Sequence, residues 1–319
     1  MSKTFIDKLP LELKNFYVKK IAREASTKII YKIFLNKKSF IGIDFNKNEY
    51  EYKQFIYIYN ILSKIDISIP EIIYKDQSNL LLVCEDFGEL RYDKILRNYS
   101  IKNLLKYSLD TLLVMNKNIL FDNSIEIPLY NKNIFINEIK ELPLFYFEFI
   151  KLKDNKNLLE EEFLNIWLDL YNLIDFEFNK FCHKDFNLNN LLYLPERKNH
   201  LKCGVIDFQS AFWGESCWDL FSFLEDSRID YSNQFNEEMI EYFYKNTYQK
   251  ISLKSYTFKY HFLNCSRQTR LLGRWIKLSR ELNNKSYLNF ISVTKKRLES
   301  SLSLLKNDKL SNFYNKYIF

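Results

Sequence analysis

The segment His183-Lys184-Asp185-Phe186-Asn187-Leu188-Asn189-Asn190 decides how this chain is interpreted. An aspartate and an asparagine lie five residues apart in a short loop, and the apolar run Leu-Leu-Tyr-Leu at 191–194 follows at once. Short polar side chains are common in turns because they bond to nearby backbone groups. A carboxylate and a carboxamide directly before an apolar strand also favour a site for a hard cation, which prefers oxygen ligands.

A second segment, Gly-Val-Ile-Asp-Phe-Gln-Ser-Ala-Phe-Trp-Gly at 204–214, runs from an apolar stretch straight into Asp207. We expect short paired strands around 191–194 and 201–206, so that the two loops meet and bring Asp185, Asn190 and Asp207 together. Asn190 and Asp207 are then candidate Mg²⁺ ligands, and Asp185 is free to orient an attacking hydroxyl. Phosphoryl transfer needs this alignment and charge neutralisation rather than covalent chemistry.

Periodicity divides the chain into two lobes. Residues 29–45 and 71–84 read as β-hairpins, and residues 48–64 between them carry apolar positions at helical spacing. After residue 100 the pattern becomes helical, and we expect helices at 101–117, 158–174, 236–246 and 262–283. The prediction is an α+β fold, with a small antiparallel β lobe that contains one helix (residues 1–86) and a larger, mainly helical lobe (residues 87–319).

Composition narrows the functional class. The 319 residues carry a formal net charge of +7, but the basic residues are scattered among acids, so we do not expect nucleic-acid binding. The five cysteines are odd in number and lack a Cys-x-x-Cys pair, which indicates buried free thiols in a reducing compartment. No apolar run approaches the roughly 18–20 residues of a membrane span. We expect a cytoplasmic protein that is not bound to a membrane; the sequence does not define an oligomeric state.

The motif pair resembles a known family. His-x-Asp-x-x-x-x-Asn followed by a strand and Ile-Asp-Phe-Gln is similar to the kinase-like phosphotransferases, which include aminoglycoside and choline kinases. The order of the elements fits their bilobal, protein-kinase-like fold over nearly the whole chain. The segments at 80–89, 204–226 and 267–278 are most similar to those of bacterial kinases that phosphorylate the anomeric hydroxyl of N-acetylmuramate or N-acetylglucosamine in cell-wall recycling. The resemblance therefore implies an ATP- and Mg²⁺-dependent kinase for a small hydroxyl compound.

The resemblance also implies residue roles. Asp185 corresponds to the catalytic carboxylate, and Asn190 and Asp207 correspond to the Mg²⁺ ligands. His183 corresponds to a residue that braces the loop, and Asp219 to the aspartate that ties the helical lobe to that loop.

Nucleotide contacts are implied in the small lobe. Cys-Glu-Asp-Phe-Gly at 84–88 matches the hinge between lobes, where backbone groups of Glu85 and Phe87 meet the adenine. No glycine-rich loop is present; Ser26 and Thr27 in Glu-Ala-Ser-Thr-Lys (24–28) stand in its place and offer hydroxyl and N–H groups to phosphate. The strand at 39–45 lacks the lysine with which protein kinases hold phosphates, and Lys28 is a candidate replacement.

The acceptor is expected to be a small molecule, because only residues 208–218 separate Asp207 from Asp219 and no Ala-Pro-Glu follows. An aminoglycoside, choline or homoserine kinase is an alternative. So is a nucleotide-binding pseudokinase, since Asn187 is neutral where relatives often carry His or Lys and the strand at 39–45 lacks a lysine. The intact set of Asp185, Asn190 and Asp207 argues against the pseudokinase.

Two further features have two interpretations each. Arg267, Arg270 and Arg274 either line a substrate pocket or form a salt-bridged helix face. Trp213, just after Asp207, is the one tryptophan placed to stack on a sugar, although tryptophans more often belong to the core.

Overall fold

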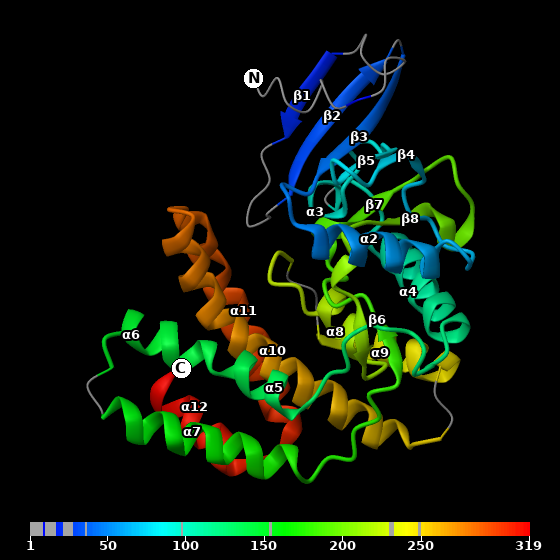
Figure 1. The fold of residues 1–319 in the computed structure, drawn as a ribbon. Coiled ribbons are helices and arrows are strands. Elements are labelled where there is room, and N and C mark those ends of the chain that lie inside the picture. Colours follow the sequence, from blue (N-terminus) through cyan, green and yellow to red (C-terminus); the bar gives the residue numbers. More distant parts are fainter. Residues whose placement is uncertain are drawn as a thin grey trace. The chain divides into compact units, whose positions relative to one another are not determined.

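The computed structural model describes residues 9, 17–21, 28–35, 37–96, 98–152, 155–229, 233–247 and 250–319 (Figure 1). The chain forms two compact units. The first comprises the ranges 1–111 and 189–210, and the second comprises 112–188 and 211–319. A five-stranded antiparallel sheet in the first unit and many helices in the second confirm the expected α+β class.

The sheet of the first unit has the strand order β1-β2-β3-β5-β4, and all neighbours are antiparallel. The two predicted hairpins are confirmed as β2–β3 and β4–β5, whereas β1, which pairs with β2, was not expected. The strands are β1 (Tyr17–Ile21), β2 (Ile29–Leu35), β3 (Lys38–Asp44), β4 (Ile72–Asp76) and β5 (Leu81–Glu85).

Strand β2 has two different faces, because successive side chains of a strand point to opposite sides. Tyr31 and Ile33 pack with Leu81 and Val83 in a buried core cluster. The alternate positions of β2 face a cavity instead. The alternation of β2 side chains therefore separates the core cluster of this unit from the face that lines the cavity.

The single helix predicted in the small lobe is confirmed as α2 (Glu49–Leu62). Its N-terminus is capped by Asn48, whose side-chain oxygen accepts the Glu51 backbone N–H at 3.0 Å. Phe55 on its buried face lies with its ring centroid 4.8 Å from that of Phe208. The helix is thus packed directly against the residue that follows Asp207.

The predicted pair of short strands is also confirmed, as β7 (Leu191–Tyr193) and β8 (Cys203–Val205) with Leu191 opposite Val205. The hairpin packs against Phe87 in the segment after β5. A β-carbon at Gly204 would lie 2.6 Å from Cδ2 of Phe87, so only glycine allows this close approach. This packing groups residues 189–210 with the first unit, while the division of the sequence at residues 86 and 87 stays a prediction.

The second unit is mainly helical. The predicted helices are confirmed as α4, α7, α9 and α10, although α4 begins in the first unit, and a second short strand pair, β6–β9, was not expected. The elements are α4 (Ile101–Asn118), α5 (Lys132–Ile139), a π-helix (Leu142–Tyr146), α6 (Phe147–Phe149), α7 (Lys156–Tyr171), β6 (Lys180–Cys182), β9 (Phe212–Gly214), α8 (Trp218–Leu224), α9 (Asn233–Thr247), α10 (Leu253–Glu281), α11 (Ile291–Leu305) and α12 (Asp308–Tyr317).

Helix α10 is the long central element of this unit and contacts α5, α8, α9, α11 and the π-helix (Figure 1). It approaches the backbone before the π-helix so closely that a β-carbon at Gly273 would lie 2.0 Å from the carbonyl oxygen of Glu141. Arg274, the next residue, donates through Nε to the Glu141 carboxylate at 2.7 Å. A glycine and a neighbouring ion pair therefore fix the crossing of these two segments.

The five cysteines are free and buried, as expected. Burial raises the pKa of the Cys84 thiol to about 12 and that of the Cys203 thiol to about 11, so both are protonated at neutral pH. Among the described residues, no helix combines the length and the apolar character needed to cross a membrane.

We expect Gly273→Ala to lower the free energy of unfolding by about 1–3 kcal/mol, because the added methyl group would overlap the Glu141 backbone. The better helix propensity of alanine offsets only about 1 kcal/mol. Urea unfolding followed by circular dichroism measures the difference. Lys254→Ala, at an exposed position of the same helix, is the control and should leave the midpoint nearly unchanged. Equal stability of Gly273→Ala and the unsubstituted protein would contradict this packing.

Candidate active site

A cavity of about 710 Å³ lies within the first unit, on the face of the sheet opposite the core cluster. This volume is in the range of pockets that enclose small molecules and cofactors. The wall comes from β1, β2, β3, β5, the hinge, β7 and the segment after β8. Its main lining residues are Lys19, Lys28, Ile30, Lys32, Phe34, Ile41, Ile43, Cys84, Glu85, Asp86, Phe87, Gly88, Glu89, Arg91, Lys94, Asn189, Leu192, Ile206, Asp207 and Phe208.

Residues 85–89, which include part of the predicted hinge, form part of the cavity wall. The Asp86 carboxylate accepts the Gly88 N–H at 2.9 Å and lies 3.2 Å from Nζ of Lys32. Lys32 also lies 3.2 Å from Glu89. Burial by itself would lower the pKa of Lys32, but these two carboxylates outweigh it and raise the pKa. Lys32 therefore remains a charged group that is anchored at the hinge.

The side chain of Glu85 is paired with an arginine. Its carboxylate accepts a hydrogen bond from Nη2 of Arg197 at 2.7 Å, and its backbone N–H donates to the Glu71 carbonyl at 2.8 Å. The Arg197 guanidinium lies 4.9 Å from the centre of the Phe87 ring. Sequence reasoning did not identify Arg197, which comes from the loop between β7 and β8. Both the side chain and the N–H of Glu85 thus have partners within the first unit. Adenine contacts through backbone groups of Glu85 and Phe87 stay a prediction.

The two predicted metal ligands lie at the same end of the β7–β8 hairpin. The Ile206 N–H donates to the Asn190 carbonyl at 3.0 Å, immediately before Asp207. Asp207 has a φ of +66°, a conformation that is unusual for a residue other than glycine. Oδ1 of Asp207 accepts hydrogen bonds from Lys28 Nζ at 2.9 Å and from Gln209 Nε2 at 3.2 Å. The chain therefore holds Asp207 in place through both its backbone and its side chain.

The donor chemistry of Asn190 and Asp207 fits Mg²⁺, which is bound in phosphoryl-transfer sites by one or two protein oxygens together with phosphate and water. Within the described parts of the chain, no group of three or more His, Cys, Asp or Glu side chains is arranged to hold a metal. A cation at this position would therefore depend on nucleotide oxygens for the rest of its ligands.

The catalytic-loop candidate lies in the second unit, after β6. Asp219 at the start of α8 accepts the His183 N–H at 2.6 Å and the Lys184 N–H at 3.0 Å, one on each carboxylate oxygen. His183 is fully buried beside Phe186, and Lys184 has a φ of +78°. These bonds fix the backbone directly before Asp185. The resemblance implies that His183 and Asp219 support this loop, and these roles stay predictions.

A second carboxylate, missed by the sequence analysis, holds the other end of this loop. Asp226 is fully buried and accepts the Leu188 N–H at 3.1 Å. Its other oxygen accepts Nη1 of Arg228 at 2.9 Å. The only sequence signal is an acidic residue directly after an apolar helix, and such residues are common in loops. The loop from residue 183 to residue 188 is consequently clamped at both ends.

Arginines of α10 lie near Asp185. Arg270 forms an ion pair with Glu138, and Arg274 forms one with Glu141, as the salt-bridged interpretation of this helix predicted. Burial lowers the pKa of Arg267 to about 10, against the opposing effect of the Asp226 and Asp185 carboxylates. The stacking role considered for Trp213 is wrong, because this side chain is only 2% exposed and packs against Phe121 and Phe181.

The structure thus groups the predicted site residues into two sets. Asn190, Asp207 and the cavity belong to the first unit, whereas Asp185 belongs to the second with His183 and Asp219. That Asp185, Asn190 and Asp207 meet stays a prediction. Ser26 and Thr27 lie outside the described residues.

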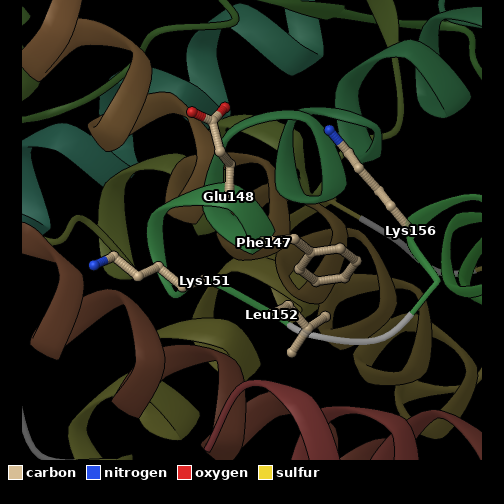
Figure 2. Close-up of a pocket in the computed structure, with 5 residues that line it drawn as sticks. All are labelled: Phe147, Glu148, Lys151, Leu152 and Lys156. Atoms are coloured by element: carbon tan, nitrogen blue, oxygen red, sulfur yellow. The ribbon is translucent and has the colours of Figure 1, made fainter.

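A second hollow, of about 250 Å³, lies in the second unit around α6 and the start of α7. Figure 2 shows that the charged ends of Glu148, Lys151 and Lys156 spread apart around Phe147 and Leu152. Glu148 instead pairs with Arg280, at 3.3 Å between Oε2 and Nη1. The hollow has no converging set of functional groups.

Comparison with known proteins gives a match of residues 146–253 to the Phosphotransferase enzyme family. An N-acetylmuramate/N-acetylglucosamine kinase of Caulobacter vibrioides is 30% identical over 111 residues, which is 35% of this chain. The matched segment spans 30% of the length of that kinase.

Solved structures share the fold. Choline kinase LicA from Streptococcus pneumoniae has a TM-score of 0.59 at 15% identity, covering 89% of this chain and 93% of its own. The ADP-bound aminoglycoside phosphotransferase APH(2'')-Ib has a TM-score of 0.59 at 18% identity, covering 88% and 94%. A choline/ethanolamine kinase family protein from Mesorhizobium loti has a TM-score of 0.61 at 8% identity, covering 97% and 95%. The kinase-like fold expected from the sequence is confirmed.

The clamp by Asp219 predicts a pH dependence of stability. Burial raises the pKa of this carboxyl from 3.8 to about 7, an effect that the two N–H bonds oppose and the Asp185 charge reinforces. Because the folded state holds this proton more tightly than the unfolded chain does, the free energy of unfolding should fall as the pH rises from about 4 to about 7. Asp219→Asn cannot titrate and should therefore lose this part of the slope.

Urea unfolding at about pH 5 and about pH 7.5 measures the slope for each variant. Asp169→Asn, in which the replaced carboxylate is largely exposed, is the matched control and should keep the slope of the unsubstituted protein. If Asp219→Asn retains the full slope as well, the buried carboxyl is not the group responsible.

Proposed function

We propose that this protein is a kinase that transfers the γ-phosphoryl group of ATP to a hydroxyl of a small molecule, since residues 146–253 match the phosphotransferase enzyme family. The observation that carries the proposal is the cavity of the first unit, whose wall has six basic and four acidic side chains and contains Asp207 beside Lys28. A polyphosphate is the ligand class that such an excess of cations, beside a candidate metal-binding carboxylate, suits.

Each part of the site has a proposed role. Backbone groups of Glu85 and Phe87 bind the adenine, and Ser26 and Thr27 bind phosphate. Asn190 and Asp207 hold Mg²⁺, which neutralises phosphate charge when it is bound. Asp185 accepts a hydrogen bond from the acceptor hydroxyl and so orients its oxygen for in-line attack, while His183 and Asp219 position the loop.

An amino sugar phosphorylated at its anomeric hydroxyl is the proposed acceptor, as in the cell-wall recycling kinases of the cytoplasm that the sequence resembles. The partial similarity to the Caulobacter kinase supports this assignment. More specifically, we propose N-acetylmuramate or N-acetylglucosamine as the acceptor.

The charges that interact with Asp185 support this acceptor over a cationic one. Asp185 interacts electrostatically with the guanidinium groups of Arg267 and Arg270 and with the carboxyl group of Asp219. A pocket for choline or an aminoglycoside would need an excess of acids, because these acceptors are positively charged. Two arginines beside two acids give no such excess.

An acceptor screen tests the proposal. With ATP and Mg²⁺, we expect N-acetylmuramate and N-acetylglucosamine to release ADP, and choline, an aminoglycoside and homoserine to release none above background. The product should no longer react as a reducing sugar, because its anomeric oxygen carries the phosphoryl group. The methyl glycoside of N-acetylglucosamine, whose anomeric oxygen is blocked, is the matched control. ATP binding without turnover of any acceptor would instead support the pseudokinase alternative.

Asp185→Asn should lower kcat about 100- to 10,000-fold, the usual contribution of a side chain that orients and deprotonates the reacting group. The affinity for ATP should stay within about twofold of the unsubstituted protein, since nucleotide binding is assigned to other residues. Turnover is measured by ADP release and affinity by calorimetry. Asp175→Asn, at an exposed position of the same unit, is the control and should keep full activity. Unchanged turnover of Asp185→Asn would show that its role is assigned wrongly.

A further inference from the structure

We infer that Lys28 is the cation that contacts the phosphates of the bound nucleotide, and that Glu51 positions it. This inference rests on the proposed function, because it concerns how the same cavity holds ATP. The sequence had made Lys28 a candidate only because the strand at 39–45 has no lysine. The structure supplies independent grounds in the position, the partners and the burial of this side chain.

The position of Lys28 follows from strand alternation. Lys28 directly precedes β2, and the residues two, four and six positions later, Ile30, Lys32 and Phe34, all line the cavity with it. The residues between them include Tyr31 and Ile33 of the core cluster. Lys28 is therefore on the cavity face of β2 by the geometry of the strand and not through a chance rotamer.

The ammonium group of Lys28 lies between two carboxylates. Its Nζ is 2.9 Å from Oδ1 of Asp207 and 3.4 Å from Oε1 of Glu51, and the side chain is only 3% exposed. Burying a charged ammonium is costly unless ionised partners and hydrogen bonds compensate for the lost water. Here the partners include the proposed metal ligand, so the positive charge is held where Asp207 would meet the nucleotide phosphates.

The neighbouring strand cannot supply this charge. From β3 the cavity receives Ile41 and Ile43, which are apolar, while Lys38 at the first position of the strand pairs with Leu35 and is not part of the cavity wall. Lys32, the other β2 lysine in the wall, is bound to Asp86 and Glu89 at the hinge. The cation beside Asp207 therefore comes from the residue before β2.

Glu51 has a positioning role in this arrangement. It lies in the first turn of α2, where its backbone N–H is bonded to the Asn48 cap and its carboxylate accepts Nδ2 of Asn48 at 3.3 Å. The capped helix end thus fixes a carboxylate that in turn fixes Lys28. An ammonium group preorganised in this way can stabilise phosphate charge without reorganising when the ligand binds.

Nucleotide affinity tests the inference without relying on turnover. Calorimetry with Mg²⁺ present compares ATP with adenosine, which shares the base and ribose but lacks phosphate. For Lys28→Met we expect ATP affinity to fall about 10- to 100-fold, the effect of losing a charge-assisted hydrogen bond, with adenosine affinity within twofold. Lys28→Arg, which keeps the charge, should restore most of the ATP preference.

Two lysines serve as controls. Lys53→Met removes an exposed lysine of α2 that pairs with Glu49 at 2.7 Å, and both affinities should stay unchanged. Lys32→Met removes the hinge lysine, and the ratio of ATP to adenosine affinity should change less than in Lys28→Met. An equal loss of this ratio in Lys28→Met and Lys32→Met would overturn the assignment of the phosphate contact to Lys28.

An unchanged ratio in Lys28→Met would also overturn the inference, provided that the unsubstituted protein binds ATP. If the unsubstituted protein binds no ATP, the proposed function itself fails. Should Lys28→Met not fold, Glu51→Gln provides the test: it keeps the lysine but removes one partner, and we expect a smaller loss of ATP affinity with adenosine binding preserved. An unaltered ATP-to-adenosine ratio in Glu51→Gln would then count against the arrangement.

Discussion

The loop that carries Asp185 in the second unit depends on one costly interaction, the burial of the Asp219 carboxylate. Its two oxygens accept the backbone N–H groups of His183 and Lys184, which repay part of the cost of removing the charge from water. Asp226 repeats this solution at Leu188. Since both carboxylates are themselves buried in the helical unit, the loop that carries Asp185 inherits the rigidity of the core and not the mobility of a surface turn.

In the first unit, the carboxylate of Asp207 is held by a lysine, Lys28. Asp207 adopts a left-handed backbone conformation directly after β8, and its side chain is held by Lys28 and Gln209. Lys184 in the second unit has a left-handed conformation as well, next to Asp185. Such conformations cost energy outside glycine and persist only when surrounding contacts impose them. In both units these contacts include a charged side chain, Lys28 at Asp207 and Asp219 at Lys184, so charged groups of the candidate site also maintain the backbone around it.

Local patterns in the sequence were sufficient for the elements that carry the motifs. Alternation and turn residues predicted both hairpins of the sheet and the β7–β8 pair, and helical spacing predicted α2, α4, α7, α9 and α10, while α5, α8, α11 and α12 were not predicted. Strand β1 was missed although it pairs with the next strand along the chain, because two adjacent lysines, Lys19 and Lys20, interrupt its apolar pattern. The contact of Arg197 with Phe87 was missed because the two residues lie far apart in the sequence. Asp226 was missed for a related reason: its N–H partner lies 38 residues away, and no local pattern distinguishes it from an ordinary loop acid.

The role proposed for Lys28 shows how a positive charge can be kept at a site when its usual sequence position has no lysine. The absence of a lysine from the strand at 39–45 is one argument for a protein that binds nucleotide without turnover. Charge neutralisation, however, depends on where an ammonium group lies and not on which strand supplies it. Because β2 and β3 are adjacent antiparallel strands, a residue at the start of β2 reaches the same end of the sheet as Asp44 at the end of β3. A lysine there can approach Asp207, so the missing strand lysine no longer argues for a pseudokinase.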